Sequence, residues 1–190
     1  MGFTREQLQA FVGTEVPDLI GDDCRLLFVG INPGLWTAAV GAHFARPGNR
    51  FYPALYRSGI VDRPIDASAG MSDEDRALLC RRGVGITNIV ARATATAAEL
   101  STEELRAGAG RLRARVRRVS PRVVAIAGIT AYRSGFHRPH AVTGPQDEDW
   151  DGAAVWVVPN PSGLNAHETV DSLAVAYAAA ARAAGVLGPE

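Results

Sequence analysis

The sequence contains no lysine, because all 20 basic residues among its 190 are arginines, set against 20 acidic residues. A lysine amine is required for Schiff-base chemistry and for the Walker A phosphate loop, so both functions are excluded. Arginine stays protonated at any working pH and can bind anions without exchanging protons. The balanced charge argues against a protein that coats nucleic acid by bulk charge, but it allows a local basic groove.

Cysteine is scarce, and so are long hydrophobic runs. Cys24 and Cys80 are the only cysteines, and they are far from any spacing typical of metal ligands, which favours two reduced thiols in a cytoplasmic protein. No run of about 18 apolar residues occurs, so we expect no transmembrane helix and no membrane partner. The amino-terminal residues lack the pattern of a secretory signal. We therefore expect a cytoplasmic protein, with a monomer as the default state.

The remaining pattern predicts alternating strands and helices in one domain over residues 1–190. Short apolar runs that stop at glycine or proline predict strands at 25–30, 84–90, 122–128 and 154–158. Capping residues and apolar stripes predict helices at 4–11, 49–59, 72–82, 101–119 and 170–184, with a long loop at 32–48. Continuously apolar strands are typical of a three-layer α/β sandwich, in which helices flank a central, mostly parallel twisted sheet.

Two predicted strands end in loops that contain asparagine and proline, Gly-Ile-Asn-Pro-Gly at 30–34 and Pro-Asn-Pro-Ser-Gly at 159–163. The carboxyl ends of parallel strands meet at one edge of the sheet, where ligands bind, so we expect these loops to converge. Such sequences also form turns without any function. The aromatic residues at 36–52 favour a pocket wall over a simple reversal of the chain.

The segments 27–52, 83–90 and 159–164 resemble the mismatch-specific uracil/thymine-DNA glycosylase family, within the uracil-DNA glycosylase superfamily. The resemblance covers about residues 25–177, and its most specific feature is the pairing of the two asparagine-proline motifs. It implies a monofunctional glycosylase that flips a mismatched base out of double-stranded DNA and hydrolyses its glycosidic bond. Uracil opposite guanine is the implied substrate, with ethenocytosine-type adducts as further substrates. No metal or organic cofactor is implied.

The resemblance also implies roles for individual residues. Asn32 matches the catalytic asparagine, which holds a water near the sugar C1′ atom. Phe44 matches the aromatic residue that stacks on the extruded base, and the backbone amides of Ile31 and Phe44 match those that bind the base edge. Asn88 lies in the segment that lines the pocket floor. The wedge that fills the gap left by the base corresponds to Asn160, Ser162, Gly163 and Leu164, with the Asn160 side chain orienting this loop.

The sequence differs from other relatives at the same positions. General uracil-DNA glycosylases carry aspartate and histidine where this chain has Asn32 and Asn160, iron–sulfur glycosylases need four cysteines, and glycosylases with lyase activity use a lysine. Asparagine cannot act as a general base, so we expect slow chemistry that depends on positioning and leaving-group stabilisation. Trp36 and Thr37 are expected to face C5 of the base, so that uracil is accepted and thymine poorly. His167 is either a phosphate contact or an ordinary residue near a helix start.

Two other functions fit parts of this pattern. A non-catalytic protein that binds DNA lesions or abasic sites would keep the wedge without positioning a water, and the intact Asn32 argues against it. A generic doubly wound nucleotide-binding protein would carry a Gly-x-Gly-x-x-Gly fingerprint after its first strand, which this sequence lacks.

Overall fold

The computed structural model describes residues 2–189, so residues 1 and 190 of the predicted domain lie outside it. It contains a five-stranded sheet in the order β2-β1-β3-β5-β4, in which all neighbours are parallel except β4 and β5. The strands are β1 (Leu26–Gly30), β2 (Val84–Asn88), β3 (Val123–Ala127), β4 (Gly144–Trp150) and β5 (Ala153–Val158).

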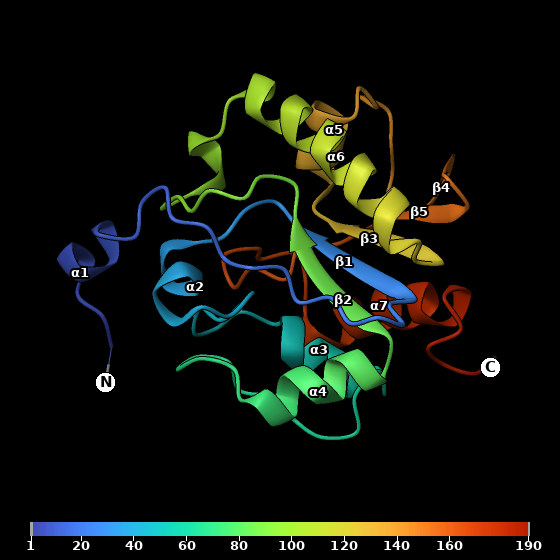
Figure 1. Cartoon of the computed structure of the whole chain (residues 1–190), viewed down its shortest axis with the longest axis horizontal. Helices are drawn as coiled ribbons and strands as arrows, with labels where there is room; N and C mark the ends of the chain where they lie inside the picture. Colours follow the sequence, from blue (N-terminus) through green and yellow to red (C-terminus); the bar gives the residue numbers. More distant parts are fainter. Residues whose placement is uncertain (1, 190) are drawn as a thin grey trace.

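Helices cover both faces of this sheet, as Figure 1 shows. One apolar core lies between the sheet and helices α3 (Phe51–Arg57), α4 (Asp73–Arg81) and α7 (Val170–Ala183). A second core lies under α5 (Thr102–Val119) and α6 (Ile129–Gly135) on the opposite face. The predicted three-layer α/β fold is therefore confirmed. Within residues 2–189, no helix is long and apolar enough to cross a membrane.

The short helices α1 (Arg5–Gln9) and α2 (Leu35–Val40) pack against each other on the side of the molecule where β1 ends (Figure 1). The position of α2 corrects the prediction of one long loop over 32–48. Its N-cap is Gly34, which supplies no side-chain hydrogen bond, so the sequence carried no capping signal for this helix.

The strand β4 and the helix α6 were also absent from the sequence prediction. The sequence of β4 is Gly-Pro-Gln-Asp-Glu-Asp-Trp, and its residues alternate between half-buried and exposed before the buried Trp150. That pattern is typical of an antiparallel edge strand, whereas all residues of β1, β2 and β3 are buried because both sheet faces are covered. The helix α6 has seven residues and a glycine at its N-cap, so its local signal is weak.

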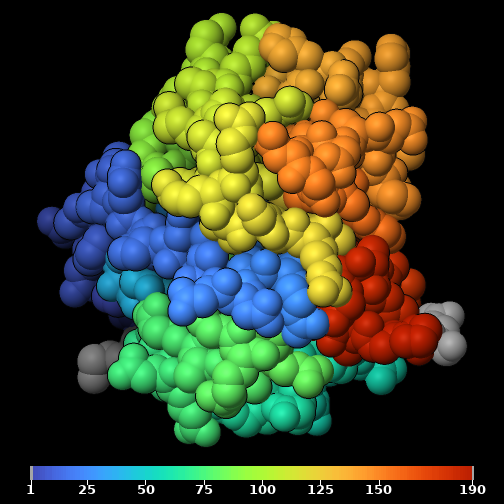
Figure 2. Space-filling view, turned by 45° about the vertical axis from the view of Figure 1, so that its right-hand side comes forward, coloured from blue at the N-terminus to red at the C-terminus, as the bar shows by residue number. Residues whose placement is uncertain are grey.

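The amino ends of the central strands are tied together around Arg25. Its backbone N–H donates to Gly83 O at 2.8 Å, and its carbonyl accepts from Arg122 N at 2.9 Å. Its guanidinium also donates to the carbonyl of Gly185 near the carboxyl terminus. Figure 2 shows these four distant segments (blue, green, yellow and red) side by side on one face. The polar loops lie at the opposite edge of the sheet.

Candidate active site

A cavity of about 170 Å³ lies at the carboxyl ends of β1, β2 and β5. Both asparagine-proline loops line it, so the predicted convergence of these loops is confirmed. Its wall includes the following residues named from the sequence: Ile31, Asn32, Thr37, Phe44, Asn88, Asn160 and Ser162. Residues from four separate parts of the chain therefore enclose one site.

The side chain of Asn32 is held in one orientation. Its Nδ2 atom donates to Arg92 O at 2.9 Å and to Thr94 Oγ1 at 2.8 Å. The Thr94 hydroxyl donates its own hydrogen to Thr96 O at 2.8 Å, so its oxygen can only accept from Asn32. Since both amide hydrogens of Asn32 are engaged, its Oδ1 atom is the group left to bind a molecule in the cavity.

An ion pair supports the segment that holds Asn32. The Arg92 guanidinium donates to both carboxylate oxygens of Glu104, at 2.6 Å from Nε and 3.0 Å from Nη2. Glu104 also accepts from the backbone N–H of Ser101 at the start of α5. The bonds from Arg92 and then from Ser101 lower the pKa of the Glu104 carboxyl to about 2, so it remains ionised across the neutral range.

Phe44 forms one aromatic wall of the cavity. Its backbone has φ 54°, in the left-handed region that aromatic residues rarely adopt, and such outliers gather at functional sites. Its ring stacks on Phe51 with centroids 4.1 Å apart and an interplanar angle of 23°. Gly30 allows this approach, since a Cβ there would lie 3.2 Å from the Phe44 ring and 2.5 Å from Asn88 Oδ1.

Asn88 and His43 form a buried polar pair beside Phe44. Asn88 Nδ2 lies 3.2 Å from His43 Nδ1, and His43 Nε2 lies 2.9 Å from Pro17 O. Burial lowers the pKa of the His43 imidazole below its usual 6.5, so the ring is neutral at pH 7. A carbonyl can only accept, so Nε2 carries the single ring hydrogen and Nδ1 accepts from Asn88.

The second asparagine-proline loop is tied to the start of α3 through Arg50. The Arg50 guanidinium donates to Ser162 O and Asn165 O, both at 2.6 Å, and to the carbonyl of Glu168. Within the loop, Asn160 Oδ1 accepts from Ser162 N at 2.9 Å. The loop is therefore held both by the Arg50 side chain, which binds its carbonyls, and by its own Asn160 side chain.

Gly163 and Leu164 lie outside the cavity wall. A Cβ at Gly163 would lie 2.6 Å from Gly48 O, so this position needs glycine for the close approach of two loops. The Leu164 side chain is 77% exposed. Because the Arg50 hydrogen bonds hold this loop in place beside the cavity, the exposed Leu164 side chain is available to insert into a bound molecule.

Two expectations from the sequence need correction or stay open. Trp36 does not line the cavity, because its ring packs edge-on against Phe3 at 5.0 Å and its indole N–H donates to Ser68 O. Thr37 alone, from that pair, is buried in the cavity wall. His167 is exposed, outside the wall, and its proposed phosphate contact stays a prediction.

The residues that hold the site were missed by the sequence prediction: Thr94, Arg92, Arg50 and the pairing of His43 with Asn88. Each acts on a partner far along the chain, such as Thr94 on Asn32 across 62 positions. A local pattern carries no signal for such contacts. The one signal in the sequence was positional. Thr94 and Arg92 follow the end of β2, at the sheet edge where the two asparagine-proline loops lie.

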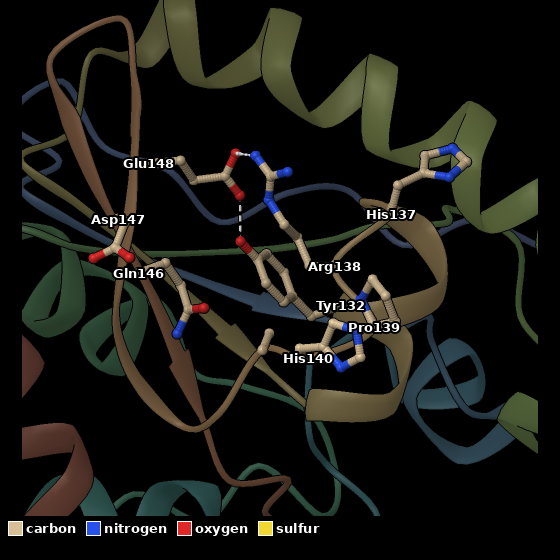
Figure 3. Close-up of a pocket in the computed structure, with 9 residues that line it drawn as sticks. Tyr132, His137, Arg138, Pro139, His140, Gln146, Asp147 and Glu148 are labelled. Atoms are coloured by element: carbon tan, nitrogen blue, oxygen red, sulfur yellow. Dashed lines mark hydrogen bonds and ion pairs between the residues drawn. The ribbon is translucent and has the colours of Figure 1, made fainter.

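A larger hollow, of about 440 Å³, lies between α6 and β4 and shares no residue with this cavity. Figure 3 shows Glu148 within it, held between Tyr132 and Arg138. Arg113 also pairs with Glu148 at 3.0 Å, so two arginines balance the negative charge of Glu148. In the part of the chain that is described, no group of three or more His, Cys, Asp or Glu side chains could hold a metal ion.

Comparison with known proteins agrees with this fold. A family model described as the uracil DNA glycosylase superfamily matches residues 17–181. The solution NMR structure of a protein from Methanosarcina acetivorans, described as a putative uracil DNA glycosylase, aligns with a TM-score of 0.60. The alignment covers 90% of this chain and 98% of that one, at 14% sequence identity, and so shows a shared fold.

Proposed function

Because the chain belongs to the uracil DNA glycosylase superfamily, we propose that it is a monofunctional DNA glycosylase that excises uracil opposite guanine. The observation that carries this proposal is the fixed orientation of the Asn32 side-chain amide. Its Nδ2 hydrogens are both donated within the protein, so its Oδ1 atom is available to a molecule in the cavity that both loops line. We propose double-stranded DNA with a mismatched or damaged base as its partner, acted on by a cytoplasmic monomer.

The reaction needs the target base outside the helix, because a paired base cannot be reached within a duplex. Flipping costs least for a mismatch, and the exposed Leu164 can fill the vacated stack and offset part of that cost. The flipped base then enters the cavity against the ring of Phe44, while Asn88 faces its polar edge.

Bond cleavage follows in this cavity. The C1′–N1 bond breaks with its electron pair on N1 of uracil, which leaves as an anion, and positive charge develops on the sugar. A water held by Asn32 Oδ1 adds to C1′ and loses a proton as the hydroxyl forms, and the uracil anion takes up a proton. The products are free uracil and an abasic site. Asparagine takes no proton itself, so positioning is its contribution.

Thr37 is our proposed determinant of the preference for uracil over thymine. Its side chain is buried in the cavity wall, so its methyl and hydroxyl groups occupy space that a thymine methyl would need. Ethenocytosine-type adducts remain proposed substrates because pairing is weak at such lesions too. In Thr37→Ala the rate for thymine should rise relative to that for uracil.

The proposal is tested with a panel of duplexes carrying uracil opposite guanine, uracil opposite adenine, or thymine opposite guanine. Alkali cleaves abasic sites, so strand scission after incubation reports excision. We expect the fastest excision for uracil opposite guanine and slow excision for thymine. Equal rates for uracil opposite guanine and adenine would contradict mismatch specificity. Tight binding of these duplexes without scission would favour the non-catalytic lesion-binding protein instead.

A further inference from the structure

We propose that His43 determines which base the cavity accepts, by fixing the orientation of the Asn88 side-chain amide. His43 lines the same cavity, and it is a positioning residue in this proposal because both of its ring nitrogens are engaged by Asn88 and Pro17. The inference rests on the proposed function, because it concerns how the same cavity distinguishes uracil from cytosine. It is carried by the geometry of two contacts, one on each nitrogen of the His43 ring.

The first contact fixes the tautomer of His43. Pro17 O lies 2.9 Å from Nε2 and can only accept, so Nε2 bears a hydrogen. The second contact then has one solution for a neutral ring, in which Nδ1 accepts from Asn88 Nδ2 at 3.2 Å. His43 is 5% exposed, so water has little access to replace either partner.

The charged surroundings of His43 oppose one another. Burial has the largest effect on the His43 ring and lowers its pKa. Among the charged residues, Asp18 favours the protonated ring and Arg76 opposes it. Asp18 is itself paired with Arg115 at 2.7 Å and accepts from Thr87 Oγ1 at 2.6 Å. From α3, the hydroxyl of Tyr52 reaches the carbonyl of His43 and not its ring. The neutral ring is thus the form present at pH 7.

The fixed ring leaves Asn88 with one free N–H and its Oδ1 atom. Gly30 keeps space open in front of Oδ1, because a Cβ there would lie only 2.5 Å away. An acceptor beside a donor matches the N3–H and O4 atoms of uracil. Cytosine presents the reverse pattern, with an acceptor at N3 and an amino group at C4, and it would meet like groups. An amide free to turn over would lose this distinction.

Protonation of His43 would reverse the arrangement. A ring with hydrogens on both nitrogens would donate from Nδ1, and Asn88 would have to present Oδ1 to it. The edge facing the base would then disfavour uracil. Since the pKa of His43 is lowered from 6.5, this reversal belongs to the range below pH 6.5, and uracil excision should fall as the pH decreases through it.

The test compares wild type with His43→Asn, whose amide lies near the place of Nδ1 and can either donate or accept. Single-turnover rates are measured for uracil and for 5-fluorocytosine, each opposite a tetrahydrofuran abasic-site analogue, so that no pairing energy differs. We expect the ratio of the two rates to fall about 10- to 100-fold in His43→Asn, the range for a hydrogen-bonded base contact. The loss of uracil excision at low pH should also disappear in this variant.

Tyr52→Phe is the matched control, because it loosens the same segment by removing the 2.8 Å bond to His43 O and leaves the ring contacts in place. It should keep the wild-type ratio. An unchanged ratio in folded His43→Asn would overturn the inference. If that variant does not fold, ¹⁵N NMR of the wild-type imidazole decides, and a ring protonated on Nδ1 at pH 7 would equally overturn it. Wild type that excises no uracil, with the expected tautomer present, would contradict the proposed function and not the contact between His43 and Asn88.

Discussion

At the scale of single residues, catalysis in this account depends on which atom of an amide faces the cavity. The Nδ2 atom of Asn32 is engaged by Arg92 and Thr94, and that of Asn88 by His43. Each contact selects one of two amide orientations that are nearly equal in shape. The residues that hydrogen-bond to these two asparagines therefore explain more of the chemistry of the site than the asparagine residue type does.

Replacing Thr94 tests this dependence. Thr94→Val keeps the shape of the side chain but removes the acceptor for Asn32 and the donor to Thr96 O. We expect single-turnover excision to slow about 2- to 10-fold, the value of one ordinary hydrogen bond, with little change in DNA affinity. Thr94→Ser keeps the hydroxyl and should retain the wild-type rate. Equal slowing in both variants would mean that packing at this site matters and the hydrogen bond does not.

At the scale of the elements, the sequence predicted those with a strong local pattern. The strands β1 and β3 are continuously apolar because they are buried on both faces, and the two unusual asparagine-proline loops follow β1 and β5. The convergence of these loops then followed from the topology of parallel sheets. The helix α2 and the strand β4 have no such pattern, since one lacks a capping side chain and the other is polar.

For the site, the sequence allowed the residues that line the cavity to be predicted, but not the residues that hold them in place. The residues that line it lie at or just after the ends of strands, so Asn32, Asn88 and Asn160 could be named from the sequence. The residues that hold it act across the chain, as Arg50 does on the carbonyls of Ser162 and Asn165. Trp36 was misplaced because α2 turns its ring away from the cavity, toward Ser68.

The wedge loop offers a second test, at Leu164. Leu164→Ala should slow uracil excision from a G·U duplex about 10-fold or more. The flipped state would lose the apolar side chain that fills the vacated stack and offsets part of the unstacking cost, which is about a few kcal/mol per base step. Excision from single-stranded DNA should be unchanged, since no stack is opened there. The free energy of unfolding should change by less than about 0.5 kcal/mol, because the side chain is exposed.

Val175→Ala on α7 is the matched control for this variant, since Val175 is also a large apolar residue and is 73% exposed. It should have the wild-type rate on both substrates. If Leu164→Ala slowed excision from single-stranded DNA as much as from the duplex, Leu164 would serve the loop structure and not the opening of DNA.

At the scale of the whole molecule, the balanced charge requires DNA contacts to be local. Arg46 is exposed at the cavity wall, and among the described residues it has no ion-pair partner. If it neutralises one phosphate, Arg46→Gln should reduce the slope of log affinity against log salt concentration by about one. Arg81→Gln changes an exposed arginine at the end of α4 and should leave the slope unchanged. Identical slopes in all three proteins would remove Arg46 from the DNA contact.

The central claim, that Asn32 holds the attacking water for a glycosylase reaction, is tested most directly by one measurement. It is the single-turnover rate of alkali-labile site formation in a G·U duplex, for wild type and for Asn32→Ala, at enzyme concentrations that saturate binding. We predict excision by wild type and a rate about 10²- to 10³-fold lower in Asn32→Ala, comparable to losing one preorganised polar group from an active site. Equal rates for the two proteins, or no alkali-labile site with wild type, would contradict the claim.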